Sequence, residues 1–104
     1  MTNPMTRTKA IALAKARVSM AQLGNQWTVY TYSSERRATW VSHPMDYWHA
    51  QNAVWEGRVC MALELLGIED AGEKAYRAAN DADYRDTGGW TQAVRLLADR
   101  ESAP

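Results

Sequence analysis

Residues 27–43 read WTVYTYSSERRATWVSH, and the alternation in this stretch decides the fold. Two runs, Trp27 to Tyr32 and Ala38 to His43, alternate and are rich in aromatic and β-branched residues, which favour strands. The residues between them, SSERR, have the length and polarity of a hairpin loop. The stretch therefore predicts a two-stranded antiparallel hairpin whose loop carries Arg36 and Arg37.

The pairing of the two strands decides which side chains share a face. Setting Thr31 opposite Thr39 gives a register in which residues alternate between the two faces of the hairpin. One face, the aromatic one, then holds Tyr30, Tyr32 and Trp40, and the other holds Trp27, Val29 and Val41. Because a two-stranded hairpin is marginally stable alone, one face must pack on helices. We expect Val29 and Val41 to point inward and the aromatic face to stay exposed.

Four helices are predicted from apolar periodicity and end signals. They run from about Thr6 to Leu23, from an N-cap at Ser42 or His43 to about Leu66, from Asp70 to Ala82, and from Trp90 to Arg100. Gly24 and Gly67 follow the first two helices as stop residues, and Ile68 stands where a Schellman closure places an apolar residue. The order helix, two-stranded antiparallel hairpin, then three helices around one core predicts an α+β fold.

The second predicted helix carries the widest apolar surface. Its apolar arc spans about 200°, more than a one-sided surface helix requires, so we expect a central helix with contacts on two sides. Its main stripe consists of Trp48, Trp55, Val59, Ala62, Leu63 and Leu66. The third helix is expected to pack through Ala75, Tyr76 and Ala79, and the fourth through Trp90, Ala93, Val94 and Leu97.

The composition favours one soluble domain. A chain of 104 residues with 46% apolar content suits a single compact domain over residues 1–104, with residues 1–5 and 101–104 expected to be disordered. Its aromatics are five Trp and five Tyr, and each of these rings carries a polar group suited to amphipathic positions. Cys60 is the sole cysteine, and no apolar stretch reaches the ~20 residues of a membrane span, so we expect a cytoplasmic protein without disulfides. Residues 1–24, rich in Arg and Ala, leave a transit peptide as the alternative.

Charge is divided between the two halves of the chain, although the net charge is zero. Residues 1–43 carry six basic side chains and one acidic one, whereas residues 44–104 carry six basic and eleven acidic ones, so their net charges are +5 and −5. A basic half attracts nucleic acid, and an acidic half repels or mimics it. The alternative is that the two halves pack together and neutralise each other.

The sequence contains no motif that specifies a reaction. The spacing of the two histidines, Asp46 and Cys60 fits neither an HExxH helix nor paired CxxC ligands, so we expect a helix cap and a core thiol. The run with Asp81, Asp83 and Asp86 lacks the pattern of a calcium loop. We therefore expect no enzyme activity, no cofactor and no metal.

Three groups of residues are candidate binding sites. The partner-binding candidate is the Arg-tipped aromatic face of the hairpin: Tyr30, Tyr32, Arg36, Arg37 and Trp40. Tyr, Trp and Arg often anchor protein interfaces, and the same residue types stack on bases and bind phosphates. A candidate mimic of nucleic-acid phosphates is the acidic set Glu69, Asp70, Glu73, Asp81, Asp83 and Asp86. A candidate nucleic-acid contact is the basic set Arg7, Lys9, Lys15 and Arg17.

The chain is short and single-domain, with a helix followed by W-x-V-x-x-Y at residues 27–32, a second strand WVSHP at 40–44 and a helix ending ALELLG at 62–67. In this overall style it resembles small phage or prophage accessory proteins. In this the chain is similar to anti-CRISPR and other anti-defence proteins. That resemblance implies a non-catalytic inhibitor or adaptor that occupies a host protein complex, such as a CRISPR effector, in the host cell cytoplasm.

Three alternatives come from the residues themselves. A small DNA- or RNA-binding regulator would use the basic first helix and the Arg-tipped hairpin, and its binding would weaken steeply with salt. A second copy of the chain could extend the hairpin into a four-stranded sheet, which would give a homodimer. A small-ligand-binding protein would gain heat stability in the presence of its ligand.

Overall fold

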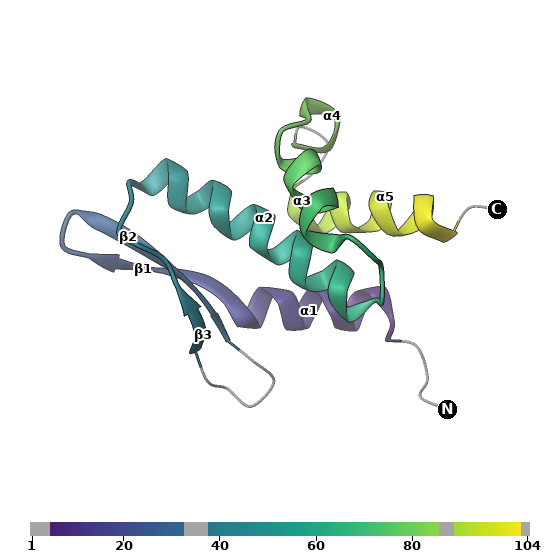
Figure 1. Cartoon of the computed structure of the whole chain (residues 1–104), viewed down its shortest axis with the longest axis horizontal. Coiled ribbons are helices and arrows are strands. Elements are labelled where there is room, and N and C mark those ends of the chain that lie inside the picture. Colours follow the sequence, from purple (N-terminus) through teal and green to yellow (C-terminus); the bar gives the residue numbers. More distant parts are fainter. Residues whose placement is uncertain (1–4, 33–37, 86–88, 103–104) are drawn as a thin grey trace.

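The computed structural model describes residues 5–32, 38–85 and 89–102, which form five helices and one three-stranded antiparallel sheet. The elements are α1 Arg7–Arg17, β1 Val18–Leu23, β2 Gln26–Tyr32, β3 Ala38–Val41, α2 Tyr47–Leu65, α3 Ala71–Ala79, α4 Ala82–Arg85 and α5 Trp90–Ser102. The sheet lies at one end of the molecule and the later helices at the other, joined by the long α2 (Figure 1). The α+β class is confirmed, with one strand and one short helix more than predicted.

The extra strand, β1, comes from the last third of the predicted first helix. Helix α1 ends at Arg17, and the chain continues directly into β1, which pairs with β2 from Val18–Thr31 to Leu23–Gln26. Gly24, with a φ of 65°, belongs to the two-residue turn between β1 and β2 and does not end a helix. Gly-Asn between two apolar runs is a hairpin signal, and pairing with β2 outweighs the helix propensity of Met, Ala, Gln and Leu in β1.

A β-bulge changes the pairing of β2 with β3. The predicted register holds at the loop end, where Tyr32 lies opposite Ala38, but the next pair is Thr31 with Trp40 rather than with Thr39. The bulge leaves one extra residue on β3, and such a one-residue shift turns the following side chains to the other face. Trp40 therefore shares the face of Val29, and Val41 shares the face of Tyr30.

Helix α2 begins later than predicted because residues 42–45 continue the sheet. The Ser42 amide donates to the Val29 carbonyl at 2.8 Å, and Trp27 and Met45 exchange two main-chain hydrogen bonds of 2.7 and 2.8 Å. Pro44 favours extended backbone at the residue before it. The N-cap is consequently Asp46, not Ser42 or His43.

The end of α2 confirms the predicted Schellman closure. Leu66 is the C-cap, and Gly67 adopts the left-handed φ of 76°. The Ile68 amide donates to the Leu63 carbonyl and the Gly67 amide to the Glu64 carbonyl, each at 3.0 Å. This turn directs the chain back into α3.

Helix α2 is central, as predicted, because it packs on the sheet and on α1, α3 and α5. One core cluster joins the helices around residues such as Leu63, and a second joins α2 to the sheet through Val18, Val29, Ala50 and Val54. Two predicted core residues are exposed: Trp48 by 75% and Tyr76 by 61%. Alanines, including Ala50, take the inward positions, and they let the backbones approach closely.

The last part of the chain is divided more finely than predicted. The third helix ends at Ala79 rather than Ala82. The short helix α4 comes next, and the amides of its residues 84 and 85 donate hydrogen bonds to the Asp81 carbonyl. Helix α5 starts as predicted, buries Ala93, Val94 and Leu97, and continues beyond Arg100 to Ser102. Of the termini expected to be disordered, residues 1–4 and 103–104 lie outside the described residues. Within the described part of the chain, no helix has the length and apolarity needed to cross a membrane.

Candidate binding surfaces

The predicted aromatic face is divided between the two faces of the sheet. Tyr30 and Tyr32 remain together, with ring centroids 5.1 Å apart in an edge-to-face arrangement. Trp40 lies on the opposite face because of the bulge. Arg36 and Arg37 lie outside the described residues.

The face that carries the two tyrosines is called here the outer sheet face. Its large side chains are Leu23, Tyr30, Tyr32 and Val41, and its smaller or polar ones are Ser19, Ala21, Gln26 and Thr28. Leu23 and Val41 are 59% and 58% exposed. Helix α2 packs against the other face through Val29 and Val18, so the inward direction predicted for Val29 is confirmed and that for Val41 is wrong. The outer sheet face thus presents apolar side chains that the described helices leave uncovered.

A cluster of three rings, which sequence reasoning missed, marks the start of α2. This aromatic corner consists of Trp27, Tyr47 and Trp48. The Tyr47 ring makes edge-to-face contacts with Trp27 at 5.3 Å and with Trp48 at 5.4 Å. The helical wheel placed Trp48 in the core, but the Trp27–Met45 bridge fixes the helix start so that Trp48 projects from the first turn.

Asp46 caps α2 next to the aromatic corner. Its Oδ1 accepts a hydrogen bond from the His49 amide at 2.9 Å, and its Oδ2 lies 2.6 Å from His49 Nδ1. The backbone hydrogen bond, and then the side-chain one, hold the pKa of Asp46 below its ordinary value. The cap of α2 is therefore Asp46, where Ser42 or His43 was predicted. The described His, Cys, Asp and Glu side chains form no group of three that could hold a metal ion.

A groove of about 330 Å³ lies between the inner sheet face and α2. Trp40 and Thr31 line it from the sheet, and Glu56, Cys60, Met61 and Glu64 line it from the helix. Trp40 is 54% exposed there. The shift of register thus moves this tryptophan from the predicted partner surface into the rim of a groove.

Cys60 is half-buried in the groove wall rather than enclosed in the core. Burial, followed by the carboxylates of Glu64 and Glu56, raises the pKa of its thiol to about 12. Its Sγ donates to Glu64 Oε1 at 3.4 Å. A thiol that stays protonated at neutral pH is a poor nucleophile, so the groove offers no activated cysteine.

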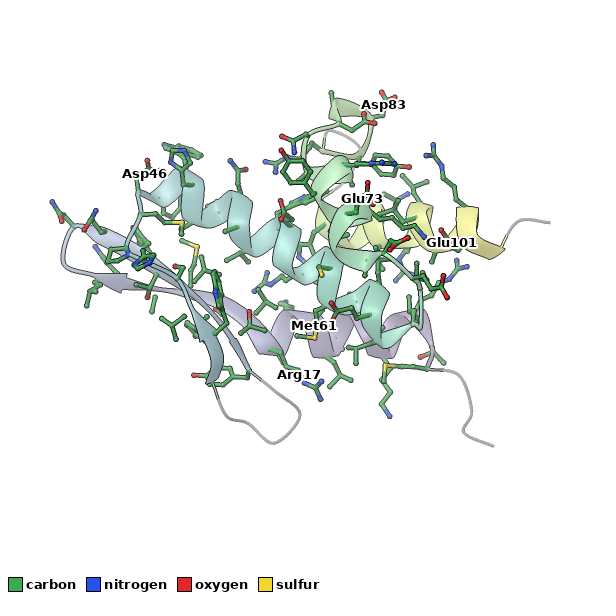
Figure 2. All side chains as sticks on the ribbon, in the orientation of Figure 1. Arg17, Asp46, Met61, Glu73, Asp83 and Glu101 are labelled. Atoms are coloured by element: carbon green, nitrogen blue, oxygen red, sulfur yellow. The ribbon has the colours of Figure 1, made fainter. Side chains whose placement is uncertain are left out.

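The acidic set does not form one continuous surface. Glu69 and Asp70 line a cleft of about 730 Å³ beside the α2–α3 turn, whereas Asp81 and Asp83 lie beyond the other end of α3. Glu73 forms an ion pair with Arg77 at 2.6 Å, so a cation lies between these two groups of carboxylates. Figure 2 shows Glu73 and Asp83 on separate helices. Asp86 lies outside the described residues.

The basic set is also dispersed. At about 100° per residue, Arg7, Lys9, Lys15 and Arg17 point to four sides of α1, with gaps of about 80–120° between neighbours. Arg7 forms an ion pair with Asp99 of α5. Lys9 and Lys15 are exposed, and Arg17 is partly buried. Helix α1 by itself does not present the single basic stripe that a phosphate backbone requires.

No protein-family model matches this chain, and no curated protein or solved structure matches it.

Proposed function

We propose that this chain is a non-catalytic binding protein that attaches to a protein partner through the outer sheet face and the aromatic corner. The observation that carries the proposal is the position of the exposed large apolar side chains. Four of them belong to these two surfaces: Leu23, Val41, Tyr47 and Trp48.

The chemistry of these surfaces supports a protein partner. Trp and Tyr give large contact areas with few rotatable bonds, and they are enriched among the residues that dominate binding energy. Leu23 and Val41 add apolar area on an otherwise polar sheet face. Edge-to-face contacts fix the Tyr47 and Trp48 rings relative to each other, so binding would cost little side-chain entropy.

The class of partner comes from the resemblance to anti-defence proteins. In this proposal the partner is a protein subunit of a host defence complex, such as a CRISPR effector, and the chain inhibits it by occupying its surface. A phosphate-mimicking role for the acidic set has less support, because Lys74 and Arg77 stand among the carboxylates and pair with Glu101 and Glu73.

Capture experiments with matched variants test the proposal. Tagged wild type, Trp48→Ala and Val41→Asp would be compared with Tyr76→Ala, which removes an exposed aromatic from α3. We expect Tyr76→Ala to retain the captured protein, and the other two to lose most of it while unfolding at the wild-type temperature. Equal capture by all four proteins would refute the proposed surface.

The nucleic-acid alternative makes a different prediction in the same experiment. If the captured material were nucleic acid, its retention would fall steeply with salt and would depend on Lys9 and Lys15 rather than on Trp48. The dispersed cations of α1 favour the protein partner instead.

A further inference from the structure

The groove between the inner sheet face and α2 lies on the opposite side of the sheet from the outer sheet face. Its floor is apolar, with Val18 and Val29 from the sheet and Met61 from α2. Its rim holds the exposed Trp40. The face of an indole ring attracts cations, and an apolar floor suits a methylene chain.

Acidic side chains follow the helix wall of this groove at a regular spacing. Glu56, Cys60 and Glu64 follow one another at intervals of four residues in α2, so they lie on one side of the helix. At 1.5 Å rise per residue, the two glutamates are about 12 Å apart along the helix axis. The groove therefore has a negative charge at each of two points, with an uncharged thiol between them.

Neither of these glutamates is paired with a cation in the described part of the chain. The described lining includes neither Lys nor Arg, and neither glutamate forms an ion pair with a described residue. The hydrogen bond that Glu64 accepts comes from the Cys60 thiol. Besides burial, both carboxylates raise the pKa of Cys60, which lines the groove between them.

This combination excludes several kinds of ligand. An anion would be repelled by the glutamates. A neutral apolar molecule would remove the carboxylates from water without pairing them, which is unfavourable. A bare metal ion would have to be shared by two residues that lie about 12 Å apart along the helix axis, and it would leave the apolar floor unused.

We propose that this groove binds a linear aliphatic polyamine, with one ammonium group near Glu56, another near Glu64, and the methylene chain along Met61 and Trp40. Each ammonium then gains a charge-assisted hydrogen bond, and the chain between them covers the apolar floor. This site is distinct from the proposed partner surface and does not depend on it.

The test measures binding of spermidine by calorimetry and by the shift in unfolding temperature. We expect spermidine to bind more tightly than putrescine, because its longer chain covers more of the apolar floor and its secondary ammonium group can lie over the Trp40 ring. The double variant Glu56→Gln/Glu64→Gln should weaken spermidine binding about tenfold or more. Asp83→Asn removes an exposed carboxylate from α4, outside the groove, and should leave binding unchanged.

A second variant keeps the test independent of the carboxylates. Gly72 lies on the groove wall, and a Cβ there would be 4.0 Å from Cys60 Sγ, an ordinary contact. Gly72→Leu should therefore fold, extend a side chain into the groove and weaken spermidine binding about tenfold. Trp48→Ala, on the proposed partner surface, should not change it.

Three results would overturn the proposal. One is equal weakening by Asp83→Asn and by the glutamine variants, which would show attraction to overall charge. Another is equal affinity for spermidine and putrescine, and the third is unchanged affinity in Gly72→Leu. Each of them would leave the proposed protein partner untouched, since that proposal is tested by Trp48→Ala and Val41→Asp.

Discussion

Arg58 Nε donates a 2.9 Å hydrogen bond to the carbonyl oxygen of Val18, the residue at which α1 passes into β1. Helix α1 ends at this point without a glycine. A second nitrogen of the same side chain, Arg58 Nη2, lies 3.5 Å from the Lys15 carbonyl oxygen. The guanidinium lies over the Trp90 ring, 5.5 Å from its centroid. One α2 side chain thus supports the change from helix to strand and connects it to α5.

Arg58→Ala should lower the free energy of unfolding by about 1–3 kcal/mol, because the part-buried hydrogen bond to the Val18 carbonyl loses its charged donor. Arg58→Lys should recover part of this loss, since an ammonium keeps the charge but not the planar fork. Urea unfolding provides the measurement, with Arg95→Ala, an exposed residue of α5, as the control. A loss no greater than that of Arg95→Ala would contradict the assigned role.

Two glycine-to-alanine substitutions should change stability in opposite directions. Gly67 has a φ of 76°, so Gly67→Ala should destabilise the fold by about 1–2 kcal/mol. Gly72 lies inside α3, where Ala is the better helix former, so Gly72→Ala should stabilise it by about 0.5–1 kcal/mol. Thermal unfolding of the two variants side by side measures the difference, and the same sign for both would contradict the assigned backbone geometry.

Leu63 is fully buried at the centre of the helical cluster. Leu63→Ala should cost about 2–5 kcal/mol through lost burial and the cavity left behind. Leu23→Ala makes the same change on the outer sheet face, where it should cost less than about 0.5 kcal/mol. Denaturant unfolding of both variants distinguishes core from surface, and a similar cost at the two sites would contradict this packing.

The cap at Asp46 should make stability depend on pH. Because the pKa of Asp46 is lowered in the folded protein, its contribution is present above the ordinary value of 3.8 and is lost as the pH falls through the lower folded value. Asp46→Asn retains a cap acceptor without the charge. The unfolding temperatures of wild type and Asp46→Asn should therefore converge in acid and separate towards neutral pH, and a constant difference would contradict the assignment.

The thiol of Cys60 should react slowly with alkylating reagents at neutral pH, since its pKa is raised to about 12. Glu56→Gln/Glu64→Gln should speed this reaction by removing two negative charges from its surroundings. The rate is followed with a maleimide reagent, and the unfolded chain gives the reference rate. A native rate equal to the unfolded rate would show that Cys60 is not in the described environment.

The parts of the fold that local signals determine could be predicted from sequence. A glycine followed by an apolar residue, here Gly67 and Ile68, is the pattern of a Schellman closure and predicts the end of α2. The spacing of the apolar residues in α5 likewise predicts which side of that helix is buried. Strand β1 could not be derived in this way, because its residues suit a helix and only pairing with β2 makes it a strand. The local signal for this strand was the Gly24–Asn25 pair, which is typical of a hairpin turn.

The candidate sites were less predictable because each depends on one position in the sheet. The bulge before Trp40 transfers this side chain from the predicted partner face to the groove. The Trp27–Met45 bridge sets the start of α2 and thereby exposes Trp48. Neither a bulge nor an isolated bridge has a local sequence pattern strong enough to place it in advance.

The bulge also has an evolutionary consequence. Because side chains alternate strictly across a strand, loss of the bulge at unchanged strand length, with Thr31 opposite Thr39, would exchange the directions of Trp40 and Val41. The indole would then lie on the outer sheet face and the valine over the groove. Deletion of the extra β3 residue would instead remove the bulge and keep both directions, so among divergent relatives the bulge and the strand length together would decide which side of the sheet carries the aromatic anchor.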